Sequence, residues 1–437
     1  MISKYKDLLD QSPNPELASL RLERLLQEDI VCDALTEKPA EFARVLVHII
    51  AVSNFLFHYL CREPQAIHLI GSENSELINI EKVADIEGLR SLKYRELLRI
   101  TSLDIYNQVA YEQILLALSE LADVILGKAL KLIDADQELK WSDKDVPMAL
   151  FAMGKLGAQE LNYSSDVDLV FVCANREDID GDVNEYHSAV IQRIRLFIRY
   201  LEETKATGFL YRVDLNLRPW GRSAPLVMPI DDTEHYYEAS TEAWERFAWL
   251  RARFVAGSSS LAADLLERLR PFRYRNILGL DDLERFIGIK TEMADIRQKQ
   301  GSWNVKMGDG GIRDIEFFIQ VLQIVNARQH QELQQTNTLK LLTCMVEIGL
   351  VDADEAKNIC ESYLFLRRLE NRLQMVDELQ VHDLPDDEET RLVIARSLGF
   401  TDVDNSLSLD NFNEYLISQR NVAKACFDKI LLKGQEI

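Results

Sequence analysis

The chain has 437 residues, more than a single compact core usually serves, so two or three domains are expected. Its 50 Lys and Arg residues against 72 Asp and Glu residues give a formal net charge of −22, which argues against a nucleic-acid backbone as the main partner. The six cysteines form no C-x-x-C pairs, and neither a signal peptide nor a membrane-spanning stretch is evident, so a cytoplasmic protein with reduced thiols is expected.

Residues 1–145 are expected to form a helical scaffold, because apolar residues recur there at steps of three and four. The clearest run is YEQILLALSELADVILGKALKLI, and the most apolar window, 45–61, is expected to be a buried helix. No catalytic combination of residues stands out in this part of the chain. A polar stretch with a proline at 141–147 marks the expected start of a second domain, 146–300.

The second domain is expected to begin with two buried strands, 149–153 and 169–173, joined by a turn at Gly154 and a short helical link. Asp166 and Asp168 stand at the mouth of the second strand. Residues two apart on a strand point to the same side, so both carboxylates should face one way. Two neighbouring like charges are costly unless they are neutralised, which a divalent cation does most simply. A metal site is therefore predicted here.

Three more elements are expected in the second domain. A helix is predicted over 186–201, where apolar residues form a stripe at helical spacing. A third strand is predicted over 209–215, and it carries Asp214. A long amphipathic helix is predicted over 234–255.

The third domain, 301–437, is expected to be a helical bundle. It opens with a turn at 309–311, after which Asp314 and Glu316 lie in the first turn of a helix. The predicted fold class is therefore α+β and mostly helical. A small mixed β-sheet forms its core, flanked by helices before it and a helical bundle after it.

Three stretches carry the most information about chemistry. They are GKLGAQELNYSSDVDLVF (154–171), YRVDLNLRPWGRSAPLV (211–227) and NVKMGDGGIRDIEF (304–317). They resemble the bacterial glutamine synthetase adenylyltransferase/adenylyl-removing enzymes of the nucleotidyltransferase superfamily, whose signature is a glycine turn followed by D-x-D. The chain departs from the motifs of this family at three positions, where glycine, arginine and phenylalanine are replaced by Ala158, Asn216 and Trp220.

The resemblance implies a site that holds two Mg²⁺ ions between Asp166, Asp168 and Asp214, the third acid coming from a neighbouring strand. Mg²⁺ suits an all-carboxylate site, and no histidine lies near these aspartates in sequence to favour zinc. The residues predicted to hold phosphate or nucleotide are Gly154, Lys155, Gly157, Ser164, Ser165, Arg218 and Arg222. For either arginine, an ion pair with a nearby acid is an equally good interpretation.

Lys306, Arg313 and Glu316 belong to the third stretch and have two interpretations. The resemblance suggests that they reach the active-site cleft from the helical domain that follows. The alternative is a capped helix start that contains an ion pair.

Members of this family usually carry two nucleotidyltransferase domains in tandem. The sequences of these stretches resemble the amino-terminal, adenylyl-removing half. The chain is thus either an excised half or a natural single-domain relative. The implied reaction is phosphorolysis, in which inorganic phosphate attacks AMP-tyrosine on glutamine synthetase and yields ADP and free tyrosine. The implied partners are glutamine synthetase, phosphate, ADP, the adenylyltransferase half and a PII nitrogen-signalling protein, with no membrane and no nucleic acid.

Three alternatives stay open. The first reverses the chemistry to ATP-dependent adenylyl transfer onto glutamine synthetase. The second is a different nucleotidyltransferase, such as an aminoglycoside-modifying or uridylylating enzyme, against which the GKLG and LRPWG contexts count. The third is an inert regulatory module that binds glutamine synthetase or PII, against which the presence of all three aspartates counts.

Overall fold

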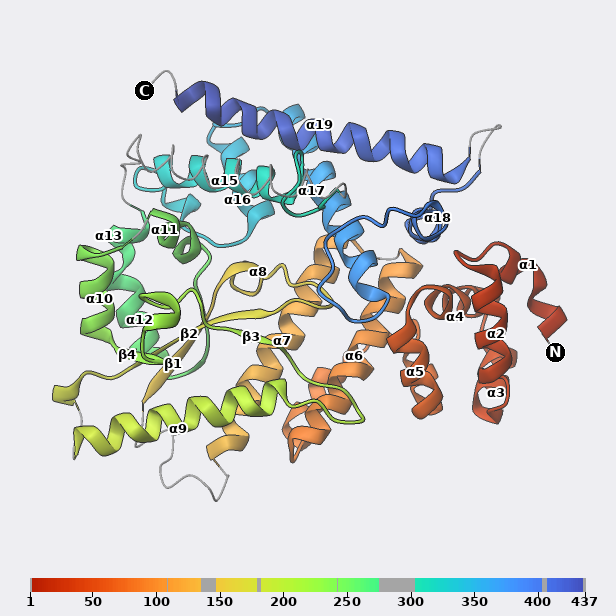
Figure 1. Ribbon diagram of the computed structural model, residues 1–437, viewed down its shortest axis with the longest axis horizontal. Coiled ribbons are helices and arrows are strands. Elements are labelled where there is room, and N and C mark those ends of the chain that lie inside the picture. The colour runs from red at the N-terminus through yellow and green to blue at the C-terminus, as the bar shows by residue number, and fades with distance from the viewer. Residues whose placement is uncertain are drawn as a thin grey trace.

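The computed structural model describes residues 2–107, 109–134, 147–178, 182–241, 243–274, 303–402 and 407–434. The fold is mostly helical around a mixed sheet that has five strands in the described residues, which confirms the predicted fold class (Figure 1). The expected domain boundaries at 145/146 and 300/301 lie outside the described residues.

The amino-terminal part is helical, as predicted. Its α-helices are α1 (Lys6–Asp10), α2 (Pro15–Leu25), α3 (Asp29–Glu37), α4 (Ala40–Val52), α5 (Asn54–Arg62), α6 (Ile86–Tyr106) and α7 (Tyr111–Asp134). The single helix expected over 45–61 is wrong, because the chain turns at Ser53, whose side chain caps α5 by accepting from the Leu56 amide. No single helix among the described residues is long and apolar enough to cross a membrane. The pair α4–α5 passes that test only jointly, and it is bent by 116°.

The sheet combines antiparallel and parallel pairs. Its strands are β1 (Met148–Ala152), β2 (Val167–Cys173), β3 (Val213–Asp214), β4 (Val227–Pro229) and β5 (Arg253–Gly257). The order is β3-β2-β1-β5, with β4 also paired to β2. β1 runs antiparallel to β2 and β5, whereas β3 and β4 run parallel to β2. The register places Asp168 opposite Asp214, so two of the predicted site carboxylates sit side by side.

Alternate residues of the central strands enter two different cores, as the two-residue period of a strand requires. Leu150 and Phe171 point into a core shared with the amino-terminal helices and α9 (Val183–Glu202). Phe151 and Val170 point into a core on the other face, which includes the fully buried Trp249. The helices that form this second core are α10 (Ile230–Ala239), α11 (Ala243–Leu250), α12 (Ser259–Arg268) and α13 (Arg270–Arg273). The sheet is therefore covered on both faces (Figure 1).

Two sequence-based predictions in this region are wrong. The expected strand 209–215 shrinks to Val213–Asp214, because the amides of Leu210 and Tyr211 both donate to the carbonyl of Leu201 instead. The expected helix 234–255 divides into α10, α11 and the strand β5.

The reason for this division is pairing with the sheet. The amides of Arg251 and Ala252 donate to the carbonyls three residues earlier, which closes α11 with a tight turn. The next residues then pair antiparallel with β1, and the tertiary contact outweighs the helical pattern.

The carboxy-terminal part forms a second helical unit with its own core. Its α-helices are α15 (Ile312–Asn326), α16 (Thr338–Glu347), α17 (Ala353–Met375), α18 (Glu388–Ser397) and α19 (Ser408–Gly434). The long α19 lies across α15 and α17 (Figure 1). This unit faces the end of the sheet where the short helix α8 (Gly154–Gly157) joins β1 to β2.

At Gly157, helix α8 packs directly against the backbone of Arg251 and Ala152. A Cβ at this position would lie 1.8 Å from the carbonyl oxygen of Arg251 and 2.7 Å from that of Ala152. We expect Gly157→Ala to lower the free energy of unfolding by about 3 kcal/mol, because neither backbone oxygen can give way cheaply. Urea unfolding followed by circular dichroism measures this change.

Gly127→Ala is the matched control for that variant. Gly127 lies within helix α7, and a Cβ at this position would meet nothing within 4 Å, so alanine should be neutral or stabilise by up to about 1 kcal/mol. Equal stabilities of the two variants would contradict the packing role of Gly157.

Candidate active site

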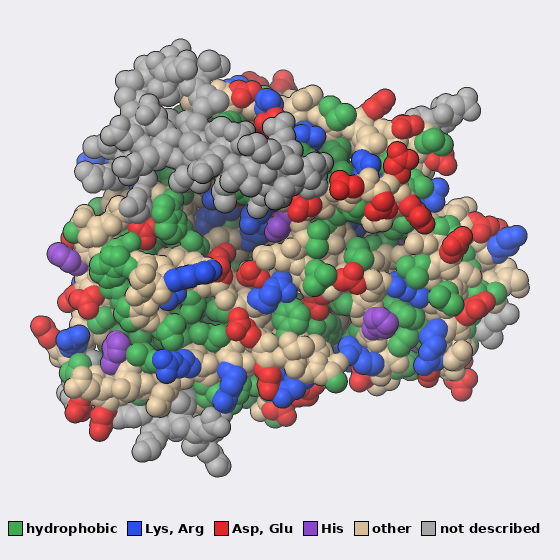
Figure 2. Space-filling model, viewed as in Figure 1, with side chains coloured by type: hydrophobic (Ala, Val, Ile, Leu, Met, Phe, Trp, Pro, Cys, Tyr) green, Lys and Arg blue, Asp and Glu red, His purple; other side chains and the backbone are tan. Residues whose placement is uncertain are grey.

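A cavity of about 480 Å³ opens between the end of the sheet and the carboxy-terminal helices. Among the predicted site residues, those that line it are Gly154, Lys155, Ser165, Asp166, Asp168, Asp214, Lys306, Arg313 and Glu316. Gln380 and His382 also line it, so segments more than 200 residues apart in the chain meet at one site. Figure 2 shows Lys, Arg and His side chains in a hollow of the surface, although acidic residues outnumber basic ones in the chain.

The three aspartates stand together at the mouth of β2, and both carboxylates of the D-x-D sequence face the cavity, as predicted. Val167 between them is fully buried on the other side. Burial, followed by the charges of Asp214 and Asp166, raises the pKa of Asp168 to about 6. The free site therefore holds a carboxylate that a cation would stabilise.

Two of the aspartates already have partners. Asp166 Oδ1 lies 2.7 Å from Nε of Arg212, which also donates to Ser164 through Nη2. Asp214 accepts from the backbone amide of Asn216 at 2.6 Å and from its side-chain amide at 3.0 Å. Asn216, a departure from the family's wording, thus orients a site carboxylate.

The donor set suits a hard divalent cation, since carboxylates from adjacent strands face one cavity. In the part of the chain that the structure describes, however, no three acidic, histidine or cysteine side chains converge closely enough to enclose a metal ion. Asp168 and Asp214 are the directly paired residues, and Asp166 is neutralised by Arg212.

Gly154 permits the close approach of Asp168. Its φ is +55°, and a Cβ there would lie 2.5 Å from Oδ2 of Asp168. Gly157 does not line the cavity but supports the packing of α8. The two glycines of the motif therefore have different physical roles, one at the carboxylate and one at the backbone of Arg251.

Lys155 is bound to a buried acid. Its ammonium lies 2.7 Å from both carboxylate oxygens of Glu370 on α17, and burial lowers the pKa of Lys155 to about 7. Burial by itself raises the pKa of Glu370, but Lys155 and Arg367 help to outweigh that effect, so the net pKa lies well below the ordinary value. Nδ1 of His382 lies 2.8 Å from Oε1 of the same carboxylate.

Sequence reasoning missed Glu370 and His382, although His382 lines the cavity. No histidine neighbours the aspartates in sequence, yet the chain beyond α17 brings one into their cavity. Neither residue belongs to a motif that could have been singled out from the sequence.

Arg218, Arg222 and Ser164 do not line the cavity. Arg218 donates to three backbone carbonyls, those of Leu215, Ala224 and Pro225. Arg222 donates to the side chain of Asn216 at 3.0 Å. Neither arginine forms an ion pair among the described residues, and both hold together the loop that follows β3.

The residues of the third stretch are split between the two interpretations. Glu316 is buried and accepts from Arg251 at 2.9 Å, with Arg313 at 3.3 Å. Burial raises the pKa of Glu316, but Arg251 and Arg313 more than reverse this, so its net pKa is lowered. Lys306 lines the cavity and makes no ion pair with any residue that the structure describes.

The loop between α8 and β2 is fixed by hydrogen bonds with side chains of α17. Arg367 donates to Asn162 Oδ1 at 2.6 Å and to the carbonyl of Glu160. Tyr363 donates to the Glu160 carboxylate at 2.6 Å. Further members accept from the backbone of the loop: Asn371 from the Tyr163 amide at 3.2 Å and Gln374 from the Ser164 amide at 3.1 Å.

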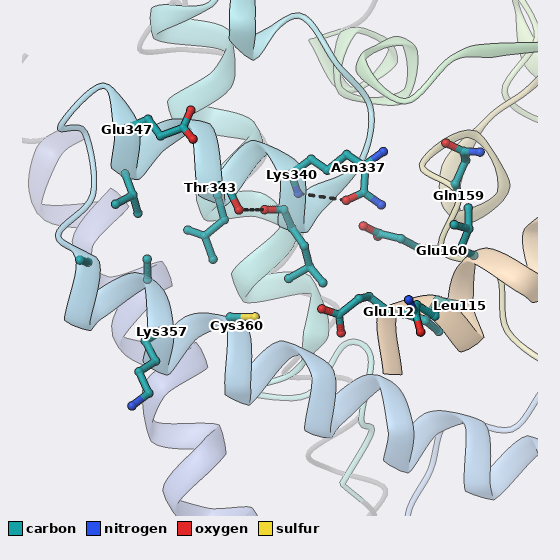
Figure 3. Close-up of a pocket in the computed structure, with 17 residues that line it drawn as sticks. Glu112, Leu115, Gln159, Glu160, Asn337, Lys340, Thr343, Glu347, Lys357 and Cys360 are labelled. Carbon is teal, nitrogen blue, oxygen red and sulfur yellow. Dashed lines mark hydrogen bonds between the residues drawn. The ribbon is translucent and has the colours of Figure 1, made fainter. Parts of the chain in front are cut away.

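A second cavity, of about 540 Å³, lies between α7, α16 and α17 (Figure 3). Gln159 and Glu160 of the same loop form part of its wall. Asn337 caps α16 by accepting from the Lys340 amide at 3.0 Å (Figure 3) and donates to the carbonyl of Ala158 at 3.1 Å. None of the predicted catalytic residues lines this cavity.

Comparisons with known proteins agree with the resemblance. A family model described as glutamate-ammonia ligase adenylyltransferase matches residues 43–268, and one described as GlnD PII-uridylyltransferase matches residues 286–431. Three relatives are named bifunctional glutamine synthetase adenylyltransferase/adenylyl-removing enzyme.

The relative from Nitrosococcus oceani is 34% identical over 78% of this chain and 36% of its own length. That from Thioalkalivibrio sulfidiphilus is 36% identical over 81% and 37%, and that from Hahella chejuensis is 32% identical over 85% and 42%. The chain thus spans well under half the length of these relatives.

We expect Asp168→Asn to stabilise the metal-free protein. The folded-state pKa of about 6 lies above the ordinary value of 3.8, so the wild type loses stability as the pH rises between these values and keeps the deficit above them. At pH 8 in EDTA the free energy of unfolding of the variant should be about 1–3 kcal/mol higher than that of the wild type. Below about pH 4 the difference should vanish.

The exposed Asp10 provides the control, because Asp10→Asn should change stability by less than about 0.5 kcal/mol. Mg²⁺ should reduce the difference in the free energy of unfolding between Asp168→Asn and the wild type at pH 8, because it stabilises only the wild type. An Asp168→Asn protein that is no more stable than the wild type at pH 8 would contradict this description of the free site.

Proposed function

The chain belongs to the glutamate-ammonia ligase adenylyltransferase family, and we propose that it removes AMP from the adenylylated tyrosine of glutamine synthetase by phosphorolysis. One observation carries the proposal: Asp168 and Asp214 from adjacent strands, with Asp166 directly before β2, line one cavity with four cationic side chains. These cationic residues are Lys155, Arg251, Lys306 and Arg313. Inorganic phosphate and the AMP-tyrosine diester are both anions, so a site that joins them needs such neutralisation.

The cationic residues differ in availability. Lys155 is held by Glu370, and Arg251 and Arg313 are held by Glu316. Lys306 has no such partner among the described residues, so we assign it to the incoming phosphate. As a compact ammonium it binds phosphate as a point charge.

The site fits Mg²⁺, for which Asp168 and Asp214 would be the ligands. Asp166 would become a further ligand if its ion pair with Arg212 opened. A pair of Mg²⁺ ions would neutralise charge on the phosphoryl oxygens. The raised pKa of Asp168 supports the assignment, because a nearby cation removes the cost of its ionisation.

The cavity also has an apolar wall that suits the adenine ring. Trp244, Phe247 and Phe317 line it. Phe247 and Phe317 are buried and stack on each other with centroids 5.5 Å apart, whereas Trp244 is exposed and can receive the purine. Flat aromatic side chains bind a purine by stacking. The nucleoside would then lie between α11 and α15, with its phosphate toward β2.

The same residues would serve ATP-dependent adenylyl transfer, which runs the chemistry in the opposite sense. The removing direction is favoured by the wording NVKMGDGGIRDIEF, which resembles the adenylyl-removing half of the family. Because the chain spans only part of its relatives, the adenylyltransferase half and a PII nitrogen-signalling protein are proposed as partners in the cytoplasm.

The test is to incubate the protein with adenylylated glutamine synthetase, Mg²⁺ and phosphate, and to measure ADP. Phosphate-dependent ADP release is expected, and Asp168→Asn should lower its rate by at least about 10²–10³-fold. Asp10→Asn should leave the rate unchanged. Removal of the metal with EDTA should abolish release, and added Mg²⁺ should restore it.

Two results would contradict the proposal. Incorporation of AMP from ATP without any ADP release would establish the opposite direction. ADP release that survives Asp168→Asn at the wild-type rate would place the chemistry at another site.

A further inference from the structure

His382 occupies a fixed position in the wall of the active-site cavity. Its backbone carbonyl accepts from the Val305 amide at 2.8 Å, and the amide of Leu384 donates to the Trp303 carbonyl at 3.0 Å. These bonds join the segment after α17 to the segment that carries Lys306. The imidazole is therefore held beside the cation that we assign to phosphate.

The carboxylate of Glu370 lies against the ring of His382. Nδ1 of His382 lies 2.8 Å from Oε1 of this fully buried carboxylate, which Lys155 keeps ionised. This contact is a close approach of charged groups without hydrogen-bond geometry, and Nε2 lies on the opposite side of the ring from Glu370. Among the described residues, Nε2 of His382 has no hydrogen-bond partner, which leaves it available to a molecule in the cavity.

The proposed reaction needs a proton at one particular atom. The leaving group is a tyrosine oxygen with an ordinary pKa of about 10, so its departure as a bare phenolate is unfavourable near neutral pH. The arginines in the cavity do not release protons, and Lys155 is engaged with both oxygens of Glu370. His382 is the lining residue whose free nitrogen suits proton transfer near neutral pH.

We propose that His382 donates a proton from Nε2 to the leaving tyrosine oxygen, and accepts it from that oxygen when the reaction runs in reverse. The inference rests on the proposed function. An oxygen of hydrogen phosphate forms a bond to phosphorus, and the bond from phosphorus to the tyrosine oxygen breaks with its electron pair on that oxygen. The proton from Nε2 completes the tyrosine hydroxyl. The proton that hydrogen phosphate brought is lost from the product ADP and restores the imidazolium.

The charged groups around His382 come from several elements. Glu370 on α17 stabilises the imidazolium, while Lys155 on α8 and Lys306 before α15 oppose it. Asp383, next in the chain, accepts from the side chain of Asn304 at 2.8 Å. The three site aspartates line the same cavity and complete the set of charged groups that face His382.

The experiment compares His382→Gln with the wild type on two substrates of different leaving group. The first is adenylylated glutamine synthetase, and the second is the 4-nitrophenyl ester of AMP, whose phenol is much more acidic than tyrosine. We expect a loss of about 10²–10⁴-fold on the first and little loss on the second, because nitrophenolate leaves without a proton. His330→Gln, at a half-buried surface histidine that does not line the cavity, should match the wild type on both.

The pH profile of ADP release gives a second measurement that does not depend on the ester. The profile of His382→Gln should differ in shape from that of the wild type, because the variant has lost one proton-transferring group. An equal loss of rate on both substrates, or a pH profile of His382→Gln with the same shape as that of the wild type, would overturn the proposal and show that His382 has only a structural role.

The experiment also separates failure of the proposed reaction direction from failure of the role proposed for His382. If the wild type releases no ADP but attaches AMP from ATP, the direction is wrong while the role of His382 is still tested. His382→Gln should then slow the attachment reaction and change the shape of its pH profile, and an attachment reaction without either change would overturn the inference.

Discussion

The ion pairs between Arg367 and the acids Glu160 and Glu370 are the interaction on which the rest of the site depends. All three side chains are buried, and Arg367 also binds the side chain of Asn162. A buried charge that loses its partner costs several kcal/mol, about 3–5 in measured cases. The loop before β2 and helix α17, some 200 residues later, therefore form one unit, because neither can move without exposing the charges of the other.

This constraint explains how a small sheet can support a defined site. Strand β3 has only two residues, so its pairing with β2 is weak support by itself. The loop that leads into β2 is instead fixed by α17, and Arg212 joins that loop to the first carboxylate. The candidate active-site cavity is completed by α11 and α15. Arg251, in the turn directly after α11, and Glu316 on α15 form a second buried ion pair. The helices are thus part of the site rather than a separate covering.

Much of the site could be predicted from local pattern. The strands around Gly154, the paired direction of Asp166 and Asp168, and the helix at 312–326 follow from the periods of strand and helix and from turn chemistry. The division of 234–255 could not, because the sequence is amphipathic throughout and only contact with β1 makes its last part a strand. Glu370 and His382 could not be found either, since their proximity to Lys155 arises from tertiary packing.

The claim that Asp168 and Asp214 form the cation-binding centre of an adenylyl-transferring site is tested most directly by locating the metal. Crystals grown with Mn²⁺ and ADP would be measured at the manganese absorption edge. An anomalous peak is expected about 2–2.3 Å from carboxylate oxygens of both aspartates, with the adenine against Trp244. Manganese bound only elsewhere, or ADP bound with no metal beside these aspartates, would contradict it.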